Sequence, residues 1–198
     1  MGLDLEYTYG QTPLDEEEKE ALLLSHITNK KELDEFEQQN IEKAVEWVIT
    51  RKFTIDQVLN EGFVLGLHKR MFGEVWKWAG KFRTSDKNIG IDKMLIPTHL
   101  YQLNEDCKYW IENKLYESDE LAIIYKHRIV KIHPFVNGNG RHSRLMADII
   151  VEKLLGGKIF SWGGVNLSGS SLERTKYIDS IKLADKGDIG PLVKFARS

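Results

Sequence analysis

The sequence predicts an all-α, mainly helical fold, in which a compact helix bundle surrounds a buried central helix and carries one short β-hairpin. Three observations lead to this prediction. Apolar residues recur at helical spacing along most of the chain. A single stretch shows a strand-turn-strand pattern. The composition, with 41% hydrophobic and 29% charged residues among 198, is typical of one globular domain with a sizeable core.

Residues 1–13 are polar and turn-rich, so we expect a flexible N-terminal arm followed by a single domain over residues 14–198. Acidic residues and then three leucines predict the first helix. Further along, apolar residues three or four positions apart predict amphipathic helices. The helices predicted before the most glycine-rich turn are Leu14–Ser25, Lys31–Thr50, Asp56–Met71, Thr98–Leu115 and Asp119–Ile132.

A sixth helix, Arg141–Gly156, is apolar on most sides, so we expect it to be the buried centre. The hairpin is predicted over Asn88–Pro97, because Ile89 and Ile91 are β-branched and a polar tip follows them. Gly163–Ser171 is rich in small residues and precedes the last helix. It is either a simple connector or a border of a ligand pocket.

The most informative stretch of the chain reads His-Pro-Phe-Val-Asn-Gly-Asn-Gly-Arg-His-Ser-Arg over residues 133–144. Gly138 and Gly140 can adopt positive φ and let a ligand approach the backbone. Their amides, with that of Asn139, can form an anion-binding nest at the start of a helix. A Gly-Asn-Gly turn by itself is typical of an ordinary helix connection. Its combination with the histidine, the phenylalanine and the two arginines of this stretch is far more specific for a functional site.

Side chains in this stretch add the chemistry. Arg141 and Arg144 lie on one face of the helix and can reach anionic oxygens. His133 titrates near neutrality and can act as a general base, while Phe135 is expected to pack into the core and orient it. From Lys126 to Arg144 there are basic residues and no acidic ones, in a chain of net charge −2. This pattern indicates a bound polyphosphate rather than nucleic acid.

These residues resemble the signature of the Fic (Fido) family, His-x-Phe-x-(Asp/Glu)-Gly-Asn-Gly-Arg-x-x-Arg. Family members are mostly nucleotidyltransferases that move AMP from a Mg-nucleotide onto a protein hydroxyl. The resemblance implies a protein adenylyltransferase with ATP as substrate and Mg²⁺ as cofactor, in which His133 deprotonates a Ser, Thr or Tyr of a target protein. The phosphate-binding residues that it implies are Gly138, Asn139, Gly140, Arg141 and Arg144.

The resemblance covers about residues 30–196. Trp76–Thr84 is similar to the Trp-Ala-Gly-x-x-Arg stretch of the family, and Tyr177–Leu192 looks like its closing helix and tail. The sequence also resembles a bacterial subgroup labelled "mobile mystery protein B". In the family a β-hairpin flap holds the target by strand addition, although an ordinary surface hairpin is the alternative here. The implied flap residues are Ile89, Gly90, Ile91, Asp92, Lys93, Met94 and Leu95.

One position departs from the family pattern, because Asn137 replaces the acidic Mg²⁺ ligand. Mg²⁺ usually relies on one or two carboxylates together with substrate phosphates. Three alternatives follow. Asn137 is a neutral ligand to Mg²⁺ carried by the nucleotide, or the enzyme transfers a different phosphate-linked group, or the domain binds nucleotide with weak or lost transferase activity.

The second departure from the family pattern concerns the segment that regulates activity. Many Fic proteins carry an inhibitory helix with the motif (Ser/Thr)-x-x-x-Glu-(Gly/Asn), and no segment of this sequence matches it. We therefore expect a separate small antitoxin to supply the glutamate, as in a toxin-like enzyme from a mobile module. The alternative is an atypical glutamate within residues 30–42, namely Glu32, Glu35 or Glu37.

Compartment and partners can also be predicted. The single cysteine, Cys107, excludes an intramolecular disulfide and fits a reducing compartment. The N-terminus lacks the pattern of a signal peptide, and no apolar stretch approaches the roughly 20 residues needed to span a bilayer. We therefore expect a cytoplasmic protein without membrane or direct nucleic-acid contacts.

Overall fold

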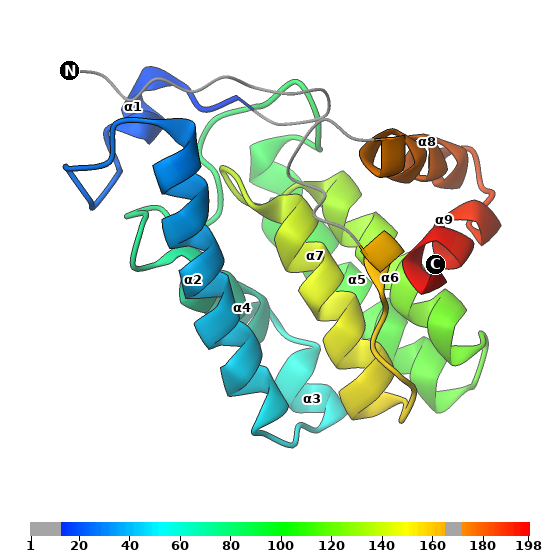
Figure 1. Ribbon diagram of the computed structural model, residues 1–198. Helices are drawn as coiled ribbons and strands as arrows, with labels where there is room; N and C mark the ends of the chain where they lie inside the picture. The colour runs from blue at the N-terminus through cyan, green and yellow to red at the C-terminus, as the bar shows by residue number, and fades with distance from the viewer. Residues whose placement is uncertain (1–12, 165–171) are drawn as a thin grey trace.

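The computed structural model describes residues 13–164 and 172–198, and helices dominate this part of the chain (Figure 1). The predicted N-terminal arm, apart from its last residue, and most of the Gly163–Ser171 stretch lie outside the described residues. The helices are α1 Glu16–Lys19, α2 Lys30–Ile49, α3 Ile55–Val58, α4 Glu61–Phe72, α5 Ile96–Glu112, α6 Ser118–Ile132, α7 Asn139–Ile149, α8 Leu172–Asp185 and α9 Gly190–Arg197.

The core is built around α7, as predicted for the central helix. Met146, Ile149 and Val151 are fully buried, and α6 packs along α7. Figure 1 shows α7 in the middle of the molecule, with α2 on one side and the packed pair α8 and α9 on the other. The α-helical hydrogen bonding ends at Ile149 and continues as a π-helical turn, Ile150–Leu154. No helix among the described residues combines the length and apolarity needed to cross a bilayer.

Two predicted helices differ from the observed ones, the first because of a side-chain cap and the second because of a backbone bridge. The Asn60 side chain accepts a hydrogen bond from the Phe63 N–H, so it begins α4 and divides the predicted helix Asp56–Met71 into α3 and α4. The predicted helix Leu14–Ser25 is only one turn long. It ends because the chain beyond α1 pairs in extended form with the segment after α4, through an isolated antiparallel bridge between Leu22 and Trp76.

The β-hairpin predicted over Asn88–Pro97 is wrong. The described chain makes bends there, then a 3₁₀ turn, Lys93–Leu95, and α5 already begins at Ile96. Asp92 caps the 3₁₀ turn through the Met94 N–H, at 2.8 Å. The guanidinium of Arg83 donates to the carbonyl of Ile91. The Ile91 N–H donates to the Ile132 carbonyl at 3.4 Å, so the backbone groups of this segment are bound by side chains and by the end of α6 in place of a second strand.

Candidate active site

The turn at residues 135–140 is held by an asparagine side chain. The Asn139 amide oxygen accepts from the Phe135 N–H at 3.0 Å, and its amide nitrogen donates to the Phe135 carbonyl at 2.9 Å. Gly138 has φ +77°, and a Cβ there would lie 2.6 Å from the ring of Phe72. Only glycine fits this position. At Gly140, apart from its chain neighbours and the backbone of its own helix, an added Cβ would have one described atom within 4 Å, a nitrogen of Arg144 at 3.9 Å, so the turn is open on that side.

His68 of α4 supports the turn from below. Its ring is stacked on Phe135, with centroids 3.6 Å apart and planes 10° apart. Its Nε2 donates to the Asn137 carbonyl at 3.1 Å, and its Nδ1 accepts from the Gly80 N–H at 3.0 Å. Burial, and then the neighbouring His142, lower the pKa of His68 well below its usual value, so the ring is neutral.

His133 lies at the C-terminal end of α6 in the left-handed conformation, with φ 55° and ψ 60°. The following Pro134 disfavours the right-handed helical conformation at this residue. The guanidinium of Arg83 fixes the backbone there, because its Nε donates to the His133 carbonyl at 2.7 Å. The Gly90 backbone passes so close that an added Cβ would lie 2.6 Å from the His133 Cβ. Together these contacts set the direction of the imidazole.

The imidazole of His133 is held neutral. Burial lowers its pKa to about 4, and the charge of Arg83 adds to this effect. The ring lies at the Val130 carbonyl, which offsets part of the decrease. A neutral imidazole at physiological pH is the form that can accept a proton.

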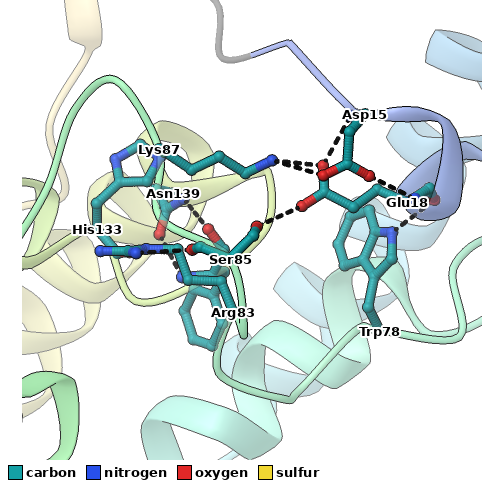
Figure 2. Close-up of polar contacts among 9 residues, drawn as sticks. Asp15, Glu18, Trp78, Arg83, Ser85, Lys87, His133 and Asn139 are labelled. Carbon is teal, nitrogen blue, oxygen red and sulfur yellow. Dashed lines mark hydrogen bonds and ion pairs between the residues drawn. The ribbon is translucent and has the colours of Figure 1, made fainter. Parts of the chain in front are cut away.

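A second network connects α1 to the segment beside His133 (Figure 2). The Glu18 carboxylate accepts from the Ser85 hydroxyl at 3.0 Å and pairs with the Lys87 ammonium. The indole N–H of Trp78 donates to the Glu18 carbonyl at 3.3 Å. The loop that replaces the predicted hairpin is therefore anchored at residues 83–87.

His133 and the turn that follows it lie at an open cavity of about 1080 Å³. It is lined by His133, by the turn with Asn137 and Gly138, and by residues of α2, α7 and α8. Arg141 and Arg144 both reach it from α7. The N-terminal end of α7, where the first backbone N–H groups of a helix have no intrahelical acceptor, opens into the same space. The cavity is large enough for a nucleotide.

The carboxylate of Glu37 contacts Arg141, one of the two arginines that line this cavity. Glu37 of α2 is 4% exposed, and one of its oxygens lies 2.5 Å from a guanidinium nitrogen of Arg141. Its other oxygen accepts from the Trp76 indole N–H at 2.6 Å. Of the three glutamates expected as alternatives, Glu37 is thus the one that reaches a signature arginine, and it reaches the first rather than the second.

Residues 58–151 match the model of the Fic/DOC family. The chain carries a Fic domain. Two curated relatives are named protein adenylyltransferase Fic: that of Drosophila virilis is 31% identical over 136 residues, and that of Aedes aegypti is 30% identical over 136 residues. Each match covers 67% of this chain and 26% of the relative, so the chain spans about a quarter of the length of these curated relatives.

Solved structures share the fold of this Fic domain at lower identity. Fic-1 from C. elegans (residues 134–508) has a TM-score of 0.62 and 21% identity, over 80% of this chain and 46% of that one. BepC from Bartonella tribocorum, solved with bound AMPPNP, has a TM-score of 0.65 and 17% identity, over 87% of this chain and 88% of that one. The predicted helical Fic fold is thereby confirmed.

The fold of the Fic domain brings most of the expected site residues to one cavity. His133, Asn137 and the segment from Gly138 to Arg141 line it together with Arg144, while Phe135 is buried behind them. Of the implied flap, Ile89 lines the cavity, and Met94 and Leu95 are exposed on the surface nearby in sequence.

Three contributors to the Fic site were missed or set aside in the sequence. The sequence does not single out His68, because nothing in its spacing links it to a turn 69 residues away. Arg83 was part of the Trp-Ala-Gly-x-x-Arg resemblance, which could have singled it out. Tyr177 was assigned only to the closing helix, and no sequence signal shows that it lines the cavity.

Proposed function

We propose that this Fic domain is a protein adenylyltransferase that transfers AMP from ATP to a hydroxyl group of a target protein. The observation that carries the proposal is that a neutral, buried imidazole and an anion-binding turn with two arginines line one cavity. The names of the curated relatives and the nucleotide analogue bound to BepC support the same chemistry. Transfer of another phosphate-linked group uses the same site and is the second candidate, favoured by Asn137 in place of an acid.

In the proposed reaction the target hydroxyl attacks the α-phosphorus of ATP. The proton of that hydroxyl passes to the His133 imidazole as the new P–O bond forms. The bond between the α-phosphorus and the oxygen bridging to the β-phosphorus breaks, and pyrophosphate leaves with the electron pair. The charge that develops on the phosphate oxygens faces the backbone N–H groups of Gly138 to Gly140, so positioning and electrostatics provide the catalysis.

The donor set fits Mg²⁺ that arrives with the nucleotide better than Mg²⁺ held by the protein. Asn137 offers one neutral amide oxygen, which in this structure accepts from the Gly138 N–H at 2.6 Å. The described residues contain no cluster of three His, Cys, Asp or Glu side chains that could hold a metal. Mg²⁺ on the phosphates would neutralise charge, with Asn137 as its protein ligand.

Glu37 supports regulation within the chain as the alternative to an antitoxin. Its carboxylate occupies Arg141, which the outer phosphates need, and does not pair with Arg144. We propose that nucleotide binding displaces Glu37 from Arg141. A separate antitoxin remains the alternative, and adding a carboxylate from a partner to Arg144 would complete the block.

The target protein is proposed to bind over the segment 88–95. Ile89, Met94 and Leu95 expose much of their apolar side chains there, and Ile89 also lines the cavity with His133. Because the segment has no strand, contact through these side chains replaces the expected strand addition. A hydroxyl presented on this surface lies next to the base.

The test is transfer of radiolabelled α-phosphate from ATP to proteins of a cell lysate, by wild type, His133→Ala and Asn137→Asp. A labelled protein band that is lost in His133→Ala supports the proposal. If wild type binds ATP in calorimetry but labels no protein, and Asn137→Asp restores the labelling, the domain is a nucleotide-binding module that lost its transferase activity. If a target protein is labelled from the γ-phosphate of ATP or from another donor, the transferred group is not AMP.

A further inference from the structure

A nearly buried ion pair joins α1 to the segment beside His133, and the proposed chemistry does not use it. The side chains of Glu18 and Lys87 are only 10% and 9% exposed, and the Lys87 ammonium donates to the Glu18 carboxylate. The other oxygen of that carboxylate accepts from the Ser85 hydroxyl at 3.0 Å. Taking two charges out of water is costly, so a pair like this is weak evidence of added stability and calls for another explanation.

Polar contacts at Glu18 hold α1 to the rest of the domain. The helix consists of three glutamates and a lysine, Glu16–Lys19, and none of them is buried. The Glu18 carbonyl accepts from the indole N–H of Trp78 at 3.3 Å, while its carboxylate binds the segment at residues 85–87. Figure 2 shows Ser85 and Lys87 reaching from the segment beside His133 toward this one side chain. A change at Glu18 is therefore passed directly to residues 85–87.

The segment that Glu18 holds packs on His133 itself. The backbone N–H groups of Arg83 and Ile91 donate to the carbonyls on either side of His133, at 2.9 and 3.4 Å. Gly90 lies so close that an added Cβ would be 2.6 Å from the His133 Cβ. Residues 85–87 lie between these contact points in the sequence. A shift of residues 85–87 would move the backbone that covers one side of the imidazole.

We propose that Glu18 is a positioning residue, which acts through Ser85 and Lys87 to hold the target-docking segment, residues 88–95, against His133. It thereby sets how closely a target hydroxyl reaches the imidazole. The inference rests on the proposed function, because it assumes that His133 is the base and that the target docks over residues 88–95. α1 precedes residues 58–151, which match the family model, so that match assigns no role to Glu18.

The charges of the pair provide a way to break the contact and to restore it. Glu18→Gln keeps the shape of the side chain but leaves the Lys87 ammonium with the Asp15 carboxylate at 3.7 Å, which is beyond hydrogen-bond distance. We expect the ammonium to turn toward water and to draw residues 85–87 away from His133, because a buried charge without its partner is strongly unfavourable. Adding Lys87→Met removes that charge, so the segment can return to its place.

The experiment compares full-length wild type, Glu18→Gln and the double variant Glu18→Gln with Lys87→Met. Glu16→Gln is the matched control, because it makes the same change on α1 at a side chain that is 86% exposed. Hydrogen–deuterium exchange measures the opening of residues 83–95, and the rate of modification by diethyl pyrocarbonate measures access to the His133 imidazole. Calorimetric ATP binding, thermal unfolding and transfer of radiolabelled α-phosphate to lysate proteins complete the set.

Glu18→Gln should speed exchange in residues 83–95 by at least about tenfold, and modification of His133 by at least about threefold. Labelling of lysate proteins should fall by at least about tenfold, while ATP affinity stays within about threefold of wild type. The double variant should return each of these rates to within about threefold of wild type, and Glu16→Gln should change none of them.

The outcomes separate this inference from the proposed function. Unchanged exchange and His133 modification in Glu18→Gln would overturn the positioning role. Exchange that speeds up equally in α7, or that the double variant does not restore, would overturn it too, because Glu18 would then contribute only general stability. If wild type binds no ATP and transfers no label, the proposed function fails, whereas the hold of Glu18 on the segment beside His133 stands if exchange and modification respond as expected.

Discussion

Three histidines buried around the signature turn should make this Fic domain lose stability in mild acid. Burial lowers the pKa of His133 and of His142 to about 4, and lowers that of His68 well below its ordinary value. In the unfolded chain all three titrate near 6.5. Between these values the unfolded state binds more protons than the folded state, so stability is complete above about pH 6.5 and falls as the pH decreases toward 4.

The size of the loss at pH 5 follows from these values. Each histidine that stays neutral in the fold costs about 1.36 kcal/mol per pH unit below 6.5, which is about 2 kcal/mol at pH 5. His133 and His142 together give about 4 kcal/mol. Asp148 acts in the opposite direction, because burial raises its pKa to about 6. Protonation of Asp148 therefore stabilises the fold by about 1 kcal/mol at pH 5 relative to pH 7. The net loss is about 3 kcal/mol before His68 is counted.

The assay is urea unfolding followed by tryptophan fluorescence at pH 7 and at pH 5. A loss of about 3 kcal/mol or more is a large share of the 5–15 kcal/mol typical of a domain. The variant His142→Gln should reduce the difference between the two pH values by about 2 kcal/mol, because one buried titrating group is removed. His99→Gln, at an exposed position, should leave the difference unchanged.

Unfolding free energies of wild type that agree within about 1 kcal/mol at pH 7 and pH 5 would refute this proton linkage. An equal loss of stability in His142→Gln at both pH values would refute it as well, since the His142 ring would then contribute packing and no proton linkage.

Two further predictions concern the phosphate-binding face. Gly138→Ala should lower the melting temperature and abolish ATP binding in calorimetry, because the new Cβ would lie 2.6 Å from Phe72 at a positive φ. Gly140→Ala should weaken ATP binding but leave the melting temperature unchanged or raise it. Glu37→Gln should bind ATP several-fold more tightly, because Arg141 loses its carboxylate, while losing about 1–3 kcal/mol in urea unfolding. Unchanged affinity in Glu37→Gln would show that the ion pair is structural only.

The sequence predicted helices well where the apolar spacing was long and regular. The helix expected at Asp119–Ile132 begins one residue earlier at Ser118, and Lys31–Thr50 is shifted by one residue. The hairpin failed because β-branched residues at 89 and 91 indicate extended backbone without showing what will pair with it. In the fold the Ile91 carbonyl accepts from the guanidinium of Arg83 and the Ile91 N–H donates to the Ile132 carbonyl, and no local pattern reveals either partner.

The candidate site divides in the same way. Residues of the signature turn are adjacent in sequence, so their meeting at one cavity could be predicted from glycines and a helix start. The contacts of Glu37 with Arg141 and of His68 with Asn137 join residues 104 and 69 positions apart. Such pairs depend on how α2 and α4 pack, which sequence spacing within one segment cannot specify.

The π-helical turn at Ile150–Leu154 has a consequence for how this chain tolerates insertions and deletions. A π turn holds one residue more than the α-helical turn that it replaces. Deleting one residue there would let α7 continue as a regular helix. The chain that returns to Asp148 through Phe160 and Trp162 would then start from a helix end rotated by about 100°. The extra residue therefore sets the register of one wall of the cavity, and sequence alignments of relatives should place a gap there rather than in the following loop.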